Sequence, residues 1–136
     1  KEKRLREPVR ITASWIAYTK TRVAPAELIF VSPTDTVADA LTKMNDAGVT
    51  QMPVLENGTP VGSLHESGIL GKLLGDRELL SANVSQIMDP SFPILGPDAN
   101  YNEIKAKLQK RRAVLIEDFK RITAIITRSD LLDLPK

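Results

Sequence analysis

The segment "AIITRSDLL", residues 124–132, places a hydroxyl and a carboxylate three positions apart, at Thr127 and Asp130. Apolar residues precede the pair and a helical pattern follows it, which predicts a junction between a strand and a helix. The first turn of a helix suits an anionic or hydroxyl-rich ligand, and a carboxylate there can accept from two vicinal hydroxyls of a ribose. The sequence therefore indicates that Asp130 binds a ribose. Thr127 would contact the ribose or an attached phosphate, and Ser129 lies near the same turn.

A structural role for the same residues competes with this interpretation. Ser and Asp are frequent at helix starts because their side chains accept from the first backbone amides. The local sequence alone favours such a cap for Ser129 and Asp130, and one residue can serve both roles.

Composition is typical of a globular protein. Of the 136 residues, 42% are hydrophobic and 26% are charged, which allows a packed core and argues against a disordered chain. No apolar run approaches the roughly 20 residues that cross a bilayer, and no secretory leader is recognisable. The absence of cysteine excludes disulfides, thiolate metal sites and a cysteine nucleophile. We therefore expect a soluble cytoplasmic protein without a membrane partner.

Charge is unevenly distributed along the chain. Residues 1–22 hold seven Lys or Arg and two Asp or Glu, a net charge of +5, whereas residues 23–136 hold twelve and fifteen, a net charge of −3. A nucleic-acid-binding domain needs its basic charge gathered on the folded surface, so nucleic acid is not the expected partner. A nucleic-acid-binding arm at 1–22 is a rival hypothesis. Because the chain opens on Lys1, we expect an upstream part of the protein.

The chain repeats itself. "VSPTDTVADAL" at 31–41 corresponds to "LGPDANYNEIK" at 95–105, and "LHESGIL" at 64–70 corresponds to "ITRSDLL" at 126–132. Two copies of a unit of about 60 residues account for nearly everything after residue 22. Each copy predicts a strand, a helix, two strands and a second helix.

In the first copy, strands are predicted at 28–32, 52–55 and 61–64, with the Asn57-Gly58 pair as a hairpin turn. A helix is predicted between a capping box of Thr36 with Asp39 and a stop at Gly48. The next helix is expected to begin at about Ser67. We expect one side of that helix to carry Leu70, Leu73 and Leu74.

In the second copy, the strands are predicted at 93–95, 113–116 and 122–126, and the last pair lacks an Asn-Gly turn. The first helix is predicted to begin near Asn100 with Glu103 as the reciprocal cap. Its apolar stripe is Tyr101, Ile104 and Leu108. "SDLLDL" begins the final helix.

The expected fold class is α/β, with two β-α-β-β-α repeats and an N-terminal linker segment. One unit exposes an apolar sheet face that it cannot cover alone, so the two copies should pack face to face about a pseudo-twofold axis. We assign residues 23–82 to repeat 1 and 83–136 to repeat 2, whose first part, 83–93, joins the copies. Residues 1–22 are expected to dock as a basic arm, since so few residues cannot bury a core alone.

This pattern resembles the CBS domain, which normally occurs as a tandem pair called a Bateman module. The matching segments are "SPTDTVADAL", "GVTQMPVLENGTPVGSLHES", "VSQIMDP" and "AIITRSDLL". The Thr-x-x-Asp element after a strand is the most specific of them. Within the family, "GVTQMPVLENGTPVGSLHESGILGKLL" followed by "NVSQIMDPSFPIL" is most similar to the C-terminal regulatory region of cystathionine β-synthase, a pyridoxal-phosphate enzyme.

The resemblance implies a position for a ligand. In related pairs the Thr-x-x-Asp element of one repeat faces the first two strands of the other repeat, with an adenine between them. We name the corresponding site of this chain the Thr127 cleft. In it, Ile125 would lie behind the adenine ring. Backbone groups around Thr50 and Met52 would read the adenine edge. The residues that repeat 1 would add are Ser32, Val49, Thr50, Gln51 and Met52.

The corresponding cleft of repeat 1, here named the His65 cleft, should be weak or vacant. His65 replaces Thr127 and Gly68 replaces Asp130, so the ribose carboxylate is missing. A single histidine cannot build a zinc site, and a structural role for it is expected. Ala124 replaces a glycine common in the family, and its methyl group is expected to narrow the approach to Thr127 and so to limit the size of the ligand.

The resemblance implies a regulatory module that binds S-adenosylmethionine, AMP, ADP or ATP and is not itself an enzyme. No nucleophile with its base, Gly-rich phosphate loop or metal-ligand spacing is recognisable, so we assign no catalytic or metal residues. The expected partners are an upstream catalytic domain, such as that of a cystathionine β-synthase (a lyase) with pyridoxal phosphate, and a second copy in a homodimer. Alternatives are a constitutive oligomerisation module with vestigial clefts, or the CBS pair of another enzyme or a transporter.

Overall fold

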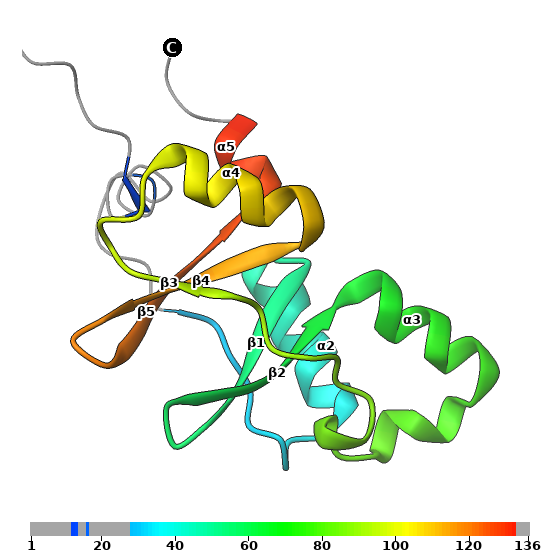
Figure 1. The fold of residues 1–136 in the computed structure, drawn as a ribbon. Helices are drawn as coiled ribbons and strands as arrows, with labels where there is room; N and C mark the ends of the chain where they lie inside the picture. The colour runs from blue at the N-terminus through cyan, green and yellow to red at the C-terminus, as the bar shows by residue number, and fades with distance from the viewer. Residues whose placement is uncertain (1–11, 14–15, 17–27, 133–136) are drawn as a thin grey trace, which may run out of the picture.

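The computed structural model describes residues 12, 13, 16 and 28–132. Two β-hairpins, each accompanied by helices, form a mixed α/β fold of two repeats (Figure 1). Repeat 1 contains α2 (Val37–Ala47), β1 (Gln51–Glu56), β2 (Thr59–His65) and α3 (Glu66–Gly75). Two short 3₁₀ helices follow, η1 (Arg77–Ser81) and η2 (Val84–Gln86). Repeat 2 contains β3 (Ile94–Leu95), α4 (Tyr101–Lys110), β4 (Ala113–Asp118), β5 (Arg121–Thr127) and α5 (Arg128–Leu132).

Both hairpins are present as predicted, and their registers correspond. In repeat 1 the antiparallel pair β1–β2 sets Gln51 opposite His65, and in repeat 2 the pair β4–β5 sets Ala113 opposite Thr127. β3 adds a parallel strand beside β4. The start of the first hairpin strand and the end of the second therefore lie together in each repeat. This is the end at which α3 and α5 begin.

The strand predicted at 28–32 is wrong in extent, because only Val31 pairs with β1. Its amide donates to the Pro53 carbonyl at 3.3 Å, and its carbonyl accepts from the Leu55 amide at 2.9 Å. The next residue already belongs to a turn, in which the Ser32 amide donates to the Asp35 carboxylate at 2.9 Å. The turn that precedes α2 therefore reduces this strand to a single bridge.

The two hairpin turns share a conformation although their sequences differ. Asn57 and Gly58 have positive φ angles of 51° and 82°, as the Asn-Gly signal predicts. Phe119 and Lys120 adopt φ angles of 52° and 64° at the corresponding positions. Residues with a Cβ occupy this region at a cost, so the second turn is held by its strands against local preference.

Helix caps were predictable from short spacings. The Thr36 hydroxyl accepts from the Asp39 amide at 3.1 Å, and Gly48 ends α2 with a φ of 68°. At α4 both halves of the capping box form: the Asn100 side chain accepts from the Glu103 amide at 2.9 Å, and the Glu103 carboxylate accepts from the Asn100 amide at 3.2 Å. These caps fix where the first helix of each repeat begins.

The predicted apolar side of α3 is wrong. Ile69 is the buried residue, with Leu73 packed against the same core, whereas Leu70 is 48% and Leu74 is 90% exposed. The helix offers two apolar pairs at i, i+4 spacing, and its sequence does not say which pair faces the sheet. α3 also begins at Glu66, one residue before the expected start.

Each repeat has its own core, and a third cluster contains residues of repeat 2 and of the linker that joins the copies. Val84 and Ile87 of this linker (residues 83–93) belong to the core of repeat 1. Phe92, also from the linker, packs with Ala113 and Leu115 on the other face of β4. The linker is therefore part of the packed structure. No helix in the described ranges is long and apolar enough to span a bilayer.

The N-terminal arm contacts repeat 2 where it is described. Ala13 and Ile16 are fully buried in the core of that repeat, and the Ala13 amide donates to the Ala99 carbonyl at 2.9 Å. Docking of the arm is thus confirmed for these residues, on the repeat that comes later in the chain. All residues of 1–22 other than 12, 13 and 16 lie outside the described residues, and the boundaries 1–22, 23–82 and 83–136 remain predictions.

Candidate functional site

The polar residues predicted around α5 do come together. The Asp130 carboxylate accepts from the Thr127 amide at 2.7 Å and from the Thr127 hydroxyl at 3.2 Å. The hydroxyls of Thr127 and Ser129 lie 3.0 Å apart. Two hydroxyls and one carboxylate thus converge where β5 passes into α5. Asp130 also caps this junction, so the structural role weighed against ligand binding is present.

The apolar residues Ala124 and Ile125, which precede Thr127 in β5, pack on opposite faces of the sheet. Ile125 packs against the cluster of Phe92, Ala113 and Leu115, which lies on the face of β4 turned away from α4. Ala124 packs into the core of repeat 2 together with Ile126. Neighbouring residues of a strand point to opposite faces, so the methyl group of Ala124 does not lie on the side of Ile125.

The start of β1 supplies the repeat 1 half of the predicted site. The Oε1 atom of Gln51 is buried and has no hydrogen-bond partner. Thr50 is exposed, and its carbonyl accepts from the Glu66 amide at 3.0 Å. The Val49 amide donates to the Met44 carbonyl at 3.0 Å, in the turn that ends α2. Gln51 is therefore the buried group here with unused hydrogen-bonding capacity.

Met52 and Ser32 are constrained by their own repeat. The Met52 side chain is fully buried in the repeat 1 core, so only its backbone can face a ligand. Ser32 is held in the turn before α2, where its carbonyl accepts from the Asp35 amide at 3.1 Å. The predicted contribution of Met52 through its backbone is compatible with this burial.

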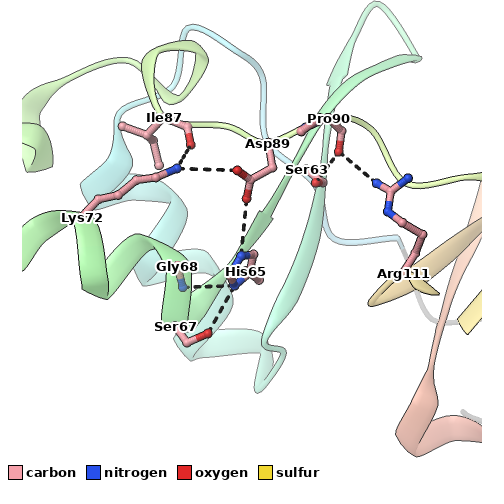
Figure 2. A network of polar contacts seen from close by, with 9 residues as sticks. All are labelled: Ser63, His65, Ser67, Gly68, Lys72, Ile87, Asp89, Pro90 and Arg111. Atoms are coloured by element: carbon pink, nitrogen blue, oxygen red, sulfur yellow. Dashed lines mark hydrogen bonds and ion pairs between the residues drawn. The ribbon is translucent and has the colours of Figure 1, made fainter. Parts of the chain in front are cut away.

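The His65 cleft is occupied by a network of the chain's own side chains (Figure 2). The Nδ1 atom of His65 accepts from the Gly68 amide at 3.1 Å and lies 3.2 Å from the Ser67 hydroxyl. Nε2 lies 3.4 Å from a carboxylate oxygen of Asp89. The other oxygen of Asp89 lies 3.7 Å from the ammonium of Lys72. The structural role expected for the histidine is therefore confirmed.

Several charged residues act on His65. Burial lowers the pKa of His65, and so do the positive charges of Arg112 and Lys72, while the Asp89 carboxylate opposes them by raising it. Burial and Arg112 are the two largest influences. Because Arg112 immediately precedes β4, the end of β2 in repeat 1 lies near the start of β4 in repeat 2.

The linker's part in this network was not predictable from local sequence patterns. The Ser63 hydroxyl donates to the Pro90 carbonyl at 2.6 Å (Figure 2). The Arg111 guanidinium donates to the Ser91 carbonyl at 2.8 Å. Ser63 and Asp89 also exchange backbone hydrogen bonds, both of 2.9 Å. Such pairings join residues far apart in the chain and have no local signature.

A groove of about 650 Å³ lies at the opposite end of the hairpins, between their turns. No residue predicted for either cleft lines it. Its walls are Leu28, Phe30, Leu55, Asn57, Gly58, Thr59, Lys120, Arg121 and Ile122. Within the described residues, no three His, Cys, Asp or Glu side chains are placed to hold a metal ion.

Comparisons with known proteins agree with this architecture. The model of the CBS domain family matches residues 22–75 and again residues 84–136. A CBS-domain containing protein from Agrobacterium tumefaciens superposes with a TM-score of 0.79 at 15% identity, over 96% of this chain and 97% of that one. A putative signal-transduction protein with CBS domains from Burkholderia ambifaria gives 0.77 at 22% identity, over 89% and 90%.

A third solved structure is that of CBSX2, a CBS-pair protein of Arabidopsis thaliana, in complex with AMP. It superposes with a TM-score of 0.64 at 25% identity and covers 77% of this chain and 84% of that one. The two family matches account for most of the sequence and coincide with the two structural repeats. The chain therefore belongs to the CBS domain family and carries the domain twice, as a tandem pair.

Proposed function

We propose that this tandem pair is a regulatory module that binds an adenosine-containing ligand in the Thr127 cleft. The observation that carries the proposal is the convergence of the Thr127 and Ser129 hydroxyls with the Asp130 carboxylate at one turn. A carboxylate beside two hydroxyls suits the paired hydroxyls of a ribose. The cap that Asp130 provides holds this arrangement in place without a ligand.

The relation between the repeats supports the contribution of β1. Arg112 of repeat 2 lies close enough to His65 of repeat 1 to lower its pKa. The two hairpins have corresponding registers, in which Thr127 matches His65 and Thr50 matches Arg112. A pseudo-twofold relation between the repeats, as expected from the sequence, would bring Thr127 to Thr50 and the start of β1 in the same way, and this is the arrangement that we propose.

Gln51 supplies a reason for a base with an exocyclic amino group, such as adenine. Its buried Oε1 atom has no partner, and such an acceptor costs free energy unless a ligand satisfies it. The exocyclic amino group of adenine is a donor of the right kind. Ile125 and Val49 offer apolar contacts to the ring. AMP in the CBSX2 structure makes the nucleotide a suitable first ligand to test.

The module itself is proposed to regulate and not to catalyse. Ligand binding would favour one arrangement of the repeats, by no more than the ligand's differential affinity for the two arrangements. The proposed receiver is a catalytic domain upstream, and the resemblance to cystathionine β-synthase makes S-adenosylmethionine the second ligand to test. Assembly as a cytoplasmic homodimer is part of the same proposal.

A second candidate function is constitutive oligomerisation with vestigial clefts. The His65 cleft, occupied by Asp89 and lacking the ribose carboxylate at Gly68, favours it for that half of the molecule. The exposed apolar residues Leu70 and Leu74 on α3 favour it as well.

Isothermal titration calorimetry with AMP, ADP, ATP and S-adenosylmethionine distinguishes the two functions. We expect heat from at least one ligand with the wild-type chain, and at least about tenfold weaker binding by Asp130→Asn, because a charge-assisted hydrogen bond is lost. Glu103→Gln is the matched control, since Glu103 caps α4 as Asp130 caps α5. Absence of heat with all four ligands would favour oligomerisation.

A further inference from the structure

His65 lies at a junction of four parts of the molecule. It is the last residue of β2 and the N-cap of α3, and it contacts Asp89 of the linker. Arg112, which immediately precedes β4 in repeat 2, is near enough to influence its charge. A change in the imidazole therefore acts on the strand, the helix, the linker and the other repeat together.

The hydrogen bonds of the ring define its protonation state. Nδ1 accepts from the Gly68 amide at 3.1 Å, which requires Nδ1 to be unprotonated. Nε2, 3.4 Å from Asp89, then carries the hydrogen and points it at a carboxylate. The neutral ring satisfies both partners. Protonation at Nδ1 would place a new N–H group of the ring against the N–H group of Gly68 and remove the cap of α3.

Charges around the ring oppose protonation on balance. Burial and the guanidinium of Arg112 hold the pKa of His65 below its usual 6.5, and Lys72 on α3 acts in the same direction. Asp89 from the linker acts against them. A protonated His65 would thus be held more strongly by the linker while being repelled by α3 and by repeat 2.

The linker is held next to this ring by several bonds. Lys72 donates to the Ile87 carbonyl at 2.6 Å and lies 3.7 Å from Asp89 (Figure 2). The backbone of Asp89 pairs with that of Ser63 through two hydrogen bonds of 2.9 Å. The ion pair is half exposed and contributes at most about 1 kcal/mol, so the backbone pairing and the imidazole are the stronger parts of this contact.

We propose that His65 is a pH-sensitive switch that keeps α3, the linker and the start of β4 in repeat 2 together while its ring is neutral, and loosens this junction when the ring is protonated. The contribution to stability is complete above pH 6.5, the usual pKa in the unfolded chain, and is lost as the pH falls through the lower pKa of the folded state. Acidification therefore weakens the contact between the repeats at the His65 cleft.

Nuclear magnetic resonance tests the switch directly, because His65 is the only histidine in the chain. We expect its ring to titrate below 6.5 in the wild-type protein. Arg112→Gln and Lys72→Met should each raise the midpoint, whereas Asp89→Asn should lower it further. A midpoint at 6.5 that none of these substitutions moves would overturn the proposal.

His65→Asn separates titration from capping, because an asparagine side chain also accepts from the Gly68 amide at an N-cap. Thermal unfolding and amide exchange at Gly68 and Asp89 are compared between about pH 7.5 and pH 5.5. Wild type should lose more stability on acidification than His65→Asn does, and the protection of these amides, measured against the intrinsic exchange rate at each pH, should fall further in wild type. Equal behaviour of the two proteins, or a wild-type protein that is more stable at the lower pH, would contradict the switch.

Discussion

The imidazole of His65 occupies the space that a side chain at Gly68 would need. A Cβ atom built on Gly68 would lie 2.6 Å from Nε2 and 3.0 Å from Nδ1 of the ring. In repeat 2 the corresponding positions exchange roles. The later residue, Asp130, carries the accepting side chain, and the earlier residue, Thr127, provides the amide. Each junction thus has one capping side chain, and its position decides whether a carboxylate lies in the first turn of the helix.

Replacement of Gly68 tests this relationship. Gly68→Ala should lose about 1–3 kcal/mol of unfolding free energy, because the methyl group displaces the ring that caps α3. Gly71→Ala is the matched control in the same helix, since a Cβ there meets nothing within 4 Å. It should gain about 0.5–1 kcal/mol, the usual effect of alanine for glycine in a helix. Urea unfolding of both variants checks the pair, and equal stabilities would contradict the account.

The double variant His65→Thr with Gly68→Asp rebuilds in repeat 1 the junction of repeat 2. We expect it to be more stable than Gly68→Asp alone, because the ring no longer occupies the space and the new carboxylate can accept from the amide of residue 65. Urea unfolding measures the difference. A double variant no more stable than the single one would show that the two junctions are not equivalent.

Gly62 is required by the linker. A Cβ atom at this position would lie 2.8 Å from Cγ of Met88 and 3.1 Å from the carbonyl oxygen of Asp89. Gly62→Ala should therefore cost about 1–2 kcal/mol in urea unfolding. Adding Met88→Ala should recover only part of the loss, because the Asp89 carbonyl belongs to the backbone and cannot move aside. Full recovery would mean that the methionine alone excludes a side chain.

Substitutions in the second hairpin turn are expected to stabilise the protein. Phe119 and Lys120 both have positive φ angles, and the Phe119 side chain is 91% exposed, so little packing is lost on its replacement. Phe119→Asn with Lys120→Gly should gain about 0.5–1 kcal/mol in urea unfolding. The reverse exchange, Asn57→Phe with Gly58→Lys, should destabilise the first hairpin. A loss of stability in the first of these double variants would contradict the assigned turn.

The face of α3 is tested by two truncations. Ile69→Ala should cost about 2–5 kcal/mol, because this side chain is only 2% exposed in the core of repeat 1. Leu74→Ala should change stability by no more than about 0.5 kcal/mol, since Leu74 is 90% exposed. Urea unfolding distinguishes them. Similar losses in both variants would restore the apolar side predicted from the sequence.

Features of the fold that depend on neighbouring residues were predictable. The Asn57-Gly58 turn, the stop at Gly48 and the capping box of α4 each follow from two residues a few positions apart. The internal repeat was predictable because the patterns of residues 31–41 and 64–70 recur in the same order at 95–105 and 126–132. The extent of the strand at 28–32 and the buried side of α3 depend on packing between elements, and both predictions failed.

The candidate site also has a part that was predictable from neighbouring residues and a part that was not. The convergence of Thr127, Ser129 and Asp130 was predictable because all three belong to one turn. The buried oxygen of Gln51 and the carboxylate of Asp89 in the His65 cleft depend on the arrangement of distant segments. Pattern and resemblance placed Gln51 in the site without revealing that its side chain lacks a partner.

A cleft shared by the two repeats is the central claim, and the affinity for AMP of one variant in each repeat tests it most directly. Gln51→Leu, in repeat 1, and Asp130→Asn, in repeat 2, should each weaken binding by about tenfold, because each removes one hydrogen-bonding group from the same bound molecule. Glu103→Gln should bind as the wild type does. Wild-type affinity in Gln51→Leu, beside a loss in Asp130→Asn, would contradict a shared cleft, and wild-type affinity in both would contradict the site.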